Sequence, residues 1–256
     1  MKKLNFLSAL FILFFSTALF SSPYYDYTGG HGHGHGKGGD NKKIFVGVGL
    51  GLGIPMGNFG KKDTLGHNDT THITGWAKPG FHFHVAGGYM FSDNVGAMIS
   101  IGGNMNGFDT KTYMTVYGYG SGSTVTATSH YTGSYLVGPA FLFPAGDKIG
   151  IHAHVLVGLM TSKYSSVTET LPAPFNVTSV STFTPVKTFG YDAGAALIIH
   201  ASDALGITIG ADYLGGTPKF TTETYTIGSS TNSSSGHSLA MSTGLINITA
   251  GIMLGF

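Results

Sequence analysis

Three histidines stand at alternate positions in a glycine-rich run near the start of the chain. The run reads HGHGHG and contains His31, His33 and His35. In an extended chain, alternate side chains project to the same side, and imidazole nitrogens suit Zn²⁺, Cu²⁺ or Ni²⁺. The run therefore predicts either a low-specificity metal-binding tail or a soluble, flexible spacer. We expect no cofactor elsewhere in the chain.

A second group of titratable residues falls at alternate positions within apolar segments. Because side chains alternate between the two faces of a strand, these residues are expected on one glycine-rich face. Two facing carboxylates would need a shared proton or a nearby cation, and buried polar groups must find partners. We expect a hydrogen-bonded polar network, with a metal site or a proton path as the alternative. Its members are His82, His84, His152, His154, Asp192, His200 and Asp212.

Eight segments with a period of two position these residues. One face carries Ile, Leu, Val or aromatic side chains, and the other carries Gly, Ala, Met, Ser or His. Each segment has roughly the nine to eleven residues that a tilted strand needs to cross the hydrocarbon layer. Short turns alternate with long loops, which is typical of outer-membrane barrels. The segments are 44–54, 81–91, 95–103, 135–143, 149–159, 189–199, 205–213 and 246–256.

The short turns also predict which residues face each other across the hairpins. A turn at 92–94 pairs His82 with Asn104 and His84 with Gly102, and a turn at 201–203 pairs Asp192 directly with Asp212. A symmetric register of the segments 135–143 and 149–159 pairs His152 with Ala140 and His154 with Gly138. Aromatic residues near the strand ends are expected to form interfacial girdles. The expected outer girdle includes Trp76, Phe81, Tyr135, Phe189 and Tyr213.

Composition decides which face meets which solvent. Only 10% of the residues are charged, and 41 are glycine. In a soluble barrel the apolar face would point inward and the other face would meet water, so it should carry Lys, Glu and Asp. Glycine suits the crowded axis of a narrow barrel better, so the apolar face is expected to meet lipid. The net charge of +1 and the absence of Arg give no sign of a nucleic-acid partner.

The N-terminal region has three parts of different character. Residues 1–22 have two lysines, an apolar run and then small residues, which is the pattern of a secretory signal peptide cleaved between residues 18 and 22. Residues 23–42 form a Gly/His-rich linker that cannot bury a core and is expected to be disordered and periplasmic. Residues 43–256 are expected to form the barrel as one domain.

The leading VGVGLGLGIPMGNF, the eight spans and the final aromatic residue resemble the small eight-stranded outer-membrane barrels of the OmpA, OmpX and OmpW-like group. The resemblance implies an all-β, eight-stranded antiparallel up-and-down transmembrane β-barrel, with short periplasmic turns and long extracellular loops, in the outer membrane of a Gram-negative bacterium. It also implies that the barrel-assembly machinery reads a C-terminal signal. In this chain the signal would be Ile248, Ala250, Ile252, Leu254 and Phe256.

Three functions compete. The first is a non-enzymatic barrel with a plugged polar lumen that has a structural role or binds an unknown extracellular ligand through its loops. The second is a narrow pore or transporter for small or hydrophobic solutes, as in OmpW-like proteins. The third, a barrel enzyme, would need a nucleophile, a base and an orienting acid together. No local signature joins Ser or Thr to His72 or His130, so we expect no enzyme.

The loops carry one further pattern. Thr, Val and Tyr alternate in TYMTVYGYGSGSTVTATSHY and VTSVSTFTPV. These segments are expected to continue the hairpins outside the bilayer and to expose strand edges there, where a partner strand can add.

Overall fold

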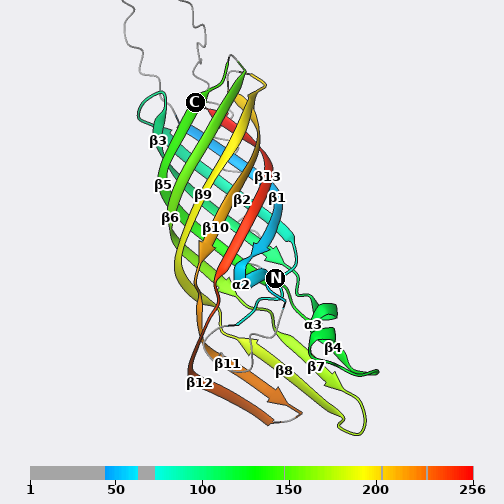
Figure 1. The fold of residues 1–256 in the computed structure, drawn as a ribbon. Helices are drawn as coiled ribbons and strands as arrows, with labels where there is room; N and C mark the ends of the chain where they lie inside the picture. The colour runs from blue at the N-terminus through cyan, green and yellow to red at the C-terminus, as the bar shows by residue number, and fades with distance from the viewer. Residues whose placement is uncertain (1–43, 63–72, 147, 203, 229, 256) are drawn as a thin grey trace, which may run out of the picture.

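The chain folds into a closed β-barrel with a second sheet at one end (Figure 1). The computed structural model describes residues 44–62, 73–146, 148–202, 204–228 and 230–255. The eight barrel strands are β1 (Ile44–Met56), β2 (Gly80–Met90), β3 (Val95–Asn106), β5 (His130–Pro144), β6 (Ile149–Lys163), β9 (Val186–His200), β10 (Leu205–Gly216) and β13 (Thr243–Gly255).

Each barrel strand pairs antiparallel with the next one along the chain, and β13 pairs with β1 to close the ring. This confirms the predicted all-β, eight-stranded, antiparallel up-and-down barrel. Most strands run further than the apolar segments do, and the extra residues lie at the long-loop end. The sequence pattern marked the parts that carry apolar side chains, whereas backbone pairing continues beyond them.

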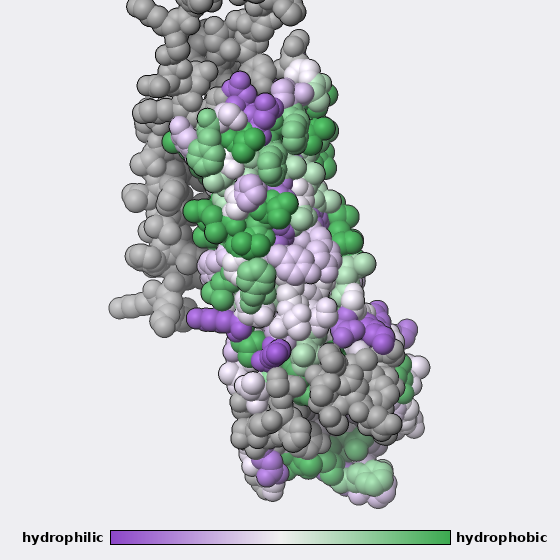
Figure 2. Space-filling model, turned by 60° about the vertical axis from the view of Figure 1, so that its left-hand side comes forward, coloured by the Kyte–Doolittle hydropathy of each residue, from purple (hydrophilic) through white to green (hydrophobic). Residues whose placement is uncertain are grey.

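The barrel wall is apolar on the outside. Leu50, Ile99 and Ile209 are each more than half exposed, although they lie in the middle of strands. Figure 2 shows such side chains covering the wall, with hydrophilic residues towards both ends of this zone. A surface of this kind is stable next to acyl chains, whereas the partly buried inner face carries glycine and small or polar residues. The structure therefore agrees with the predicted orientation of the two faces.

Among the described residues, none of the helices has the length and apolar character needed to cross a membrane.

Glycine on the inner face has a steric reason where strands close the ring. A Cβ atom on Gly51 of β1 would collide with the carbonyl oxygen of Ile248 on the neighbouring β13. A narrow barrel curves its strands strongly, so that only glycine allows this approach. Gly51 is therefore needed for closure itself.

The long loops build the second sheet and cover the barrel mouth. The order in this five-stranded sheet is β12-β11-β8-β7-β4, and in Figure 1 it lies beyond the long-loop end of the barrel. Of the two segments predicted to extend the hairpins, 177–186 contains β8 and 112–131 contains β4, but residues 110–116 form a helix. Asp109 caps this helix by accepting a hydrogen bond from the Thr112 amide. The elements are α2 (Gly57–Gly60), α3 (Thr110–Val116), β4 (Thr124–Ala127), β7 (Val167–Leu171), β8 (Val177–Phe183), β11 (Lys219–Ile227) and β12 (Ser230–Ala240).

Candidate functional site: the barrel lumen and its outer cap

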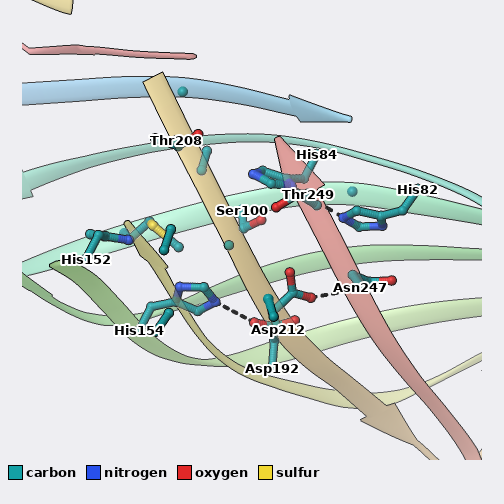
Figure 3. Close-up of a pocket in the computed structure, with 18 of the residues that line it drawn as sticks. His82, His84, Ser100, His152, His154, Asp192, Thr208, Asp212, Asn247 and Thr249 are labelled. Carbon is teal, nitrogen blue, oxygen red and sulfur yellow. Dashed lines mark hydrogen bonds and ion pairs between the residues drawn. The ribbon is translucent and has the colours of Figure 1, made fainter. Parts of the chain in front are cut away.

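Titratable side chains from four strands meet around one cavity in the lumen (Figure 3). The cavity offers about 70 Å³ to the centres of water molecules. Its lining includes six of the seven residues that the sequence predicted for a polar network, and uncharged polar side chains complete it. The six are His82, His84, His152, His154, Asp192 and Asp212.

One half of the network runs along β2. His82 Nδ1 lies 3.2 Å from Asn104 Oδ1, and His82 Nε2 lies 3.3 Å from His84 Nδ1. Because an amide oxygen only accepts, His82 donates from Nδ1 and accepts at Nε2 from the His84 Nδ1–H. This assignment leaves His84 Nε2 as a hydrogen-bond acceptor at the cavity.

The other half joins β6, β9, β10 and β13. His154 Nε2 lies 2.6 Å from Asp192 Oδ1, which is a short, charge-assisted distance. Asn247 Nδ2 donates to Asp212 Oδ1 at 2.7 Å. The carboxyl groups of Asp192 and Asp212 line the same cavity (Figure 3). Two carboxylates in such a confined space repel each other unless they share a proton or a cation lies nearby.

Two predicted registers are wrong, and both errors come from the position of a turn. The sixth hairpin turn closes between Ala201 and Leu205, one residue later than predicted. Moving a turn by one residue moves the pairing by two, so Asp192 lies opposite Leu214 and Asp212 lies opposite Gly194. The acids still share a face because the shift is even, and they meet diagonally.

The hairpin of β5 and β6 shows the same two-residue shift. His152 pairs with Leu142 and His154 pairs with Ala140, in place of the predicted Ala140 and Gly138. This turn closes between Ala145 and Ile149, with Gly146 at φ 125°. The turn therefore has three residues and begins with a left-handed glycine. The predicted pairs His82–Asn104 and His84–Gly102 are confirmed.

His152 and His200 lie apart from the hydrogen-bonded network. His152 is buried, and its ring packs edge-on against Phe45 with centroids 5.6 Å apart. His200 ends β9 at the short-turn rim and does not line the cavity. The acid pair and His154 therefore form the polar centre, with His82 and His84 on the facing strand.

Sequence reasoning missed the neutral members of the network. Asn104 and Asn247 are almost fully buried, and each supplies one side of a hydrogen bond to a titratable residue. Both stand on the inward register of their strands, so alternation with the small residues was the available signal. Four buried atoms of this region lack a hydrogen-bond partner among the described residues: Asn104 Nδ2, His152 Nε2, His154 Nδ1 and Asn247 Oδ1. The cavity is large enough for about five waters, which can hydrogen-bond to such atoms.

The proposed metal ligands fall elsewhere. Within the part of the chain that the structure describes, no three His, Asp or Glu side chains are placed to hold one metal ion. His31, His33 and His35 lie outside the described residues, so the metal-binding tail remains a prediction. The proposed assembly signal follows the outer face of β13: Ile248, Ala250 and Ile252 are exposed and Leu254 is half-buried, while Phe256 lies outside the described residues.

Aromatic side chains close the outer mouth above the polar centre. The rings of Phe59, Trp76, Phe108 and Tyr164 are all buried there. His130 lies beneath them, 5.2 Å from the Phe59 ring, and its Nδ1 accepts from the Ser165 amide. We call these five residues the cap.

The position of Trp76 differs from the prediction. It was predicted to lie in the outer girdle, but it is 2% exposed and has a positive φ of 53°. Its carbonyl accepts from the Asp109 amide at 2.8 Å, and its ring packs against Tyr113 of α3 with centroids 5.2 Å apart. The loop therefore folds inward over the mouth, where the indole joins the cap.

Polar contacts of α3 connect the cap to the outer sheet. The Tyr113 hydroxyl donates to Glu169 of β7 at 2.7 Å. Burial first, and then this hydrogen bond to a carboxylate, raise the pKa of Tyr113. Burial by itself raises the pKa of Asp109, but hydrogen bonds from Lys62 and Thr112 outweigh it and bring that pKa down to about 2. Both contacts hold α3 in place between the barrel and the sheet.

Comparisons with known proteins give fold likenesses only. Neisserial surface protein A is 10% identical with a TM-score of 0.45, covering 83% of this chain and 97% of that one. Ail, the attachment invasion locus protein of Yersinia pestis, is 12% identical with a TM-score of 0.39, covering 84% and 97%. The outer membrane protease OmpT from Escherichia coli is 9% identical with a TM-score of 0.48, covering 87% and 99%.

No family model and no curated protein match the chain. At these identities and TM-scores the solved structures carry no argument about function. The closed register of eight strands and the apolar wall place the fold among the small eight-stranded outer-membrane barrels.

Proposed function

We propose that this chain is a non-enzymatic outer-membrane barrel that acts through its extracellular sheet and keeps its lumen closed. The observation that carries the proposal is the contrast between a blocked axis and an ordered outer surface. Leu156, Met160 and Leu214 are buried between the polar centre and the cap, whereas the loops beyond the cap fold into five paired strands. The function we infer is binding or adhesion at the cell surface, together with a structural role in the envelope.

The cellular location and the partners that we propose follow from the surface of the barrel. The apolar wall fits outer-membrane lipid, and the outer face of β13 fits recognition by the barrel-assembly machinery. Residues 1–22 would direct export in a Gram-negative cell, and residues 23–42 would remain in the periplasm. Because the chain has no cysteine, Ser121→Cys gives a single label site in an exposed loop. A membrane-impermeant maleimide should label it on intact cells, and labelling only after lysis would contradict this orientation.

The buried position of His130 supports a non-enzymatic role. It is 1% exposed and its Nδ1 is engaged, so this imidazole cannot reach a substrate at the surface. The polar centre below it is separated from the outside by the cap and by the apolar layer. We therefore propose that the histidines and acids of the lumen stabilise the closed barrel and do not perform a reaction.

The narrow pore or transporter is the second candidate. The cavity of about 70 Å³ with its polar lining favours a pore, because water molecules in such a space can form part of a path through the lumen. Planar-bilayer recordings separate the two functions. A closed lumen gives no stable channel between pH 6 and 8, whereas steady conductance from the purified protein would favour the pore.

Removing part of the sheet tests the first function directly. Replacing residues 167–183 by a short Gly-Ser linker deletes β7 and β8 and leaves β6 joined to β9. The barrel should still show a mobility difference between heated and unheated samples on a gel. Attachment of expressing cells to surfaces should fall to the level of cells without the protein, and unchanged attachment would argue for a purely structural barrel.

A further inference from the structure

The outer sheet has two faces of very different chemistry. One face turns towards α3 and the cap, where Val125, Val167 and Ser179 are buried and Glu169 accepts from Tyr113. The other face is open, and threonine dominates it. Its described residues are Thr124, Thr126, Thr168, Thr170, Thr178, Val180, Thr182, Thr224, Thr226 and Thr231. We call these ten residues the threonine face.

The register shows that these residues form a regular array. Thr231, Thr226 and Val180 lie side by side on β12, β11 and β8, and the same row continues through Thr168 on β7 to Thr126 on β4. Neighbouring strands are about 4.8 Å apart. The row therefore presents methyl groups at even spacing across all five strands, and hydroxyl groups on every strand except β8, where Val180 stands.

Hydrogen bonds between threonines hold the array in place. Thr226 Oγ1 lies 3.2 Å from Thr231 Oγ1, and Thr170 Oγ1 lies 3.3 Å from Thr178 Oγ1. Each hydroxyl has both donor and acceptor capacity, so these pairs retain further capacity towards solvent. β-branched side chains also have restricted rotamers, so a partner would meet a surface that is already ordered.

The chemistry of the threonine face selects the class of partner. Its described side chains carry no charge, so an anionic glycan, a nucleic acid or an acidic peptide would find no counter-charge there. A purely apolar partner would bury the hydroxyls without hydrogen bonds, which is unfavourable. A neutral partner that itself alternates hydroxyl and C–H groups satisfies both parts of each threonine, and a polysaccharide of uncharged sugars has this character.

We propose that the threonine face binds neutral polysaccharide on surfaces outside the cell. The inference rests on the proposed surface-binding function and names its ligand. The sheet lies at the end of the molecule furthest from the short turns (Figure 1), so it meets an external surface before the barrel does. Single hydroxyl contacts gain little over contacts with water, so binding depends on many contacts made together along a polymer.

Binding of the full-length protein in detergent to immobilised polysaccharides tests the inference. Dextran and mannan serve as neutral probes, and heparin and alginate serve as anionic ones. The wild-type protein should bind the neutral polymers and not the anionic ones. Thr168→Lys with Thr226→Lys places two charges in the central row and should weaken binding at least about tenfold.

Matched variants separate the face from the fold. Ser121→Lys adds a charge in the exposed loop before β4, outside the ten residues of the threonine face, and should bind as the wild type does. Thr168→Val with Thr226→Val keeps the branched shape but removes two hydroxyls, and should weaken binding about threefold. If the double lysine variant fails to show the heat-dependent gel shift, Thr126→Lys on the exposed edge strand takes its place.

The outcomes distinguish failure of the polysaccharide proposal from failure of the proposed surface-binding function. Loss of dextran binding in the lysine variant alone supports the inference. Equal dextran binding by the lysine variant, preference for heparin, or no binding to any polymer overturns it. If deletion of residues 167–183 still abolishes cell attachment in those cases, the surface-binding function stands with another ligand. Inhibition of ice recrystallisation without polysaccharide binding would also overturn the inference and would assign the array to ordered water.

Discussion

The barrel and the outer sheet use the same two-residue alternation against different surroundings. In the barrel, the outward residues are large and apolar and the inward residues are small, as Leu50 and Gly51 show. In the sheet, the open face carries threonine and the covered face packs on aromatic rings, as Thr168 and Val167 show. Alternation therefore identifies a strand, and the chemistry of its more exposed residues indicates whether that face meets lipid or water.

Glycines of the barrel and of the outer loops differ in the space around them. Gly51 lies where a Cβ would strike the Ile248 carbonyl, whereas Gly120, in the loop before β4, has no atom within 4 Å of such a Cβ. Gly51→Val should prevent ring closure, so that no heat-modifiable band appears, because the clash is with backbone and amounts to at least about 3 kcal/mol. Gly120→Val should fold normally. A folded Gly51→Val protein would show that the closing strands can move apart.

Polar groups should matter far more inside the barrel than on the sheet. Asp192→Ala removes the partner of His154 inside the barrel and should lower the free energy of unfolding by about 3 kcal/mol. Thr126→Ala on the open face should change it by less than about 0.5 kcal/mol. Urea unfolding in detergent micelles measures both. Similar values for the two variants would mean that the lumen is well hydrated.

The cap should be a separate unit between the two regions. Trp76→Ala removes a buried indole that packs on Tyr113, and should cost about 3 kcal/mol of local stability. Amide exchange should accelerate in α3 and in residues 73–79, while the barrel strands keep their protection. Phe175→Ala is the control, because Phe175 is an aromatic residue that is 70% exposed. Acceleration throughout the barrel would show that cap and barrel unfold together.

The smallest effect concerns the ion pair that anchors α3. Asp109 has a lowered pKa of about 2, against an ordinary value of 3.8. Its stabilisation is therefore fully present above about pH 4 and is lost as the pH falls through 2. After allowance for solvent screening, Asp109→Asn should cost about 1 kcal/mol at pH 7. Amide exchange of α3 at pH 7 and pH 2.5 measures this, and a variant that retains the wild-type acid response would exclude Asp109 as its source.

The sequence predicted the barrel well because lipid imposes a strict pattern on both faces of each strand. The eight spans, their order and the inward side of His82, His84, Asp192 and Asp212 all follow from that pattern. The register was harder to predict, because a turn moved by one residue leaves every side chain on its predicted face. This is why the errors at Ala201 and Ala145 altered the partners of the lumen residues but not their side.

The cap and the outer sheet were harder to predict for the opposite reason. Water accepts many surface sequences, so no strict pattern marked residues 110–116 as a helix or Trp76 as buried. An aromatic residue close to the predicted outer boundary fits an interfacial girdle equally well. Only the fold of the loop, with the positive φ of Trp76 and the Asp109 amide on its carbonyl, turns the ring inward.

The pairing of β13 with both β1 and β10 has a consequence for biogenesis. β13 follows the other seven barrel strands along the chain, and it supplies the hydrogen-bond partners for two of them. Until it arrives, two long edges remain open, and such edges invite pairing with other chains. Closure of the ring therefore has to wait for β13, and the open edges of β1 and β10 have to be kept away from other chains until then.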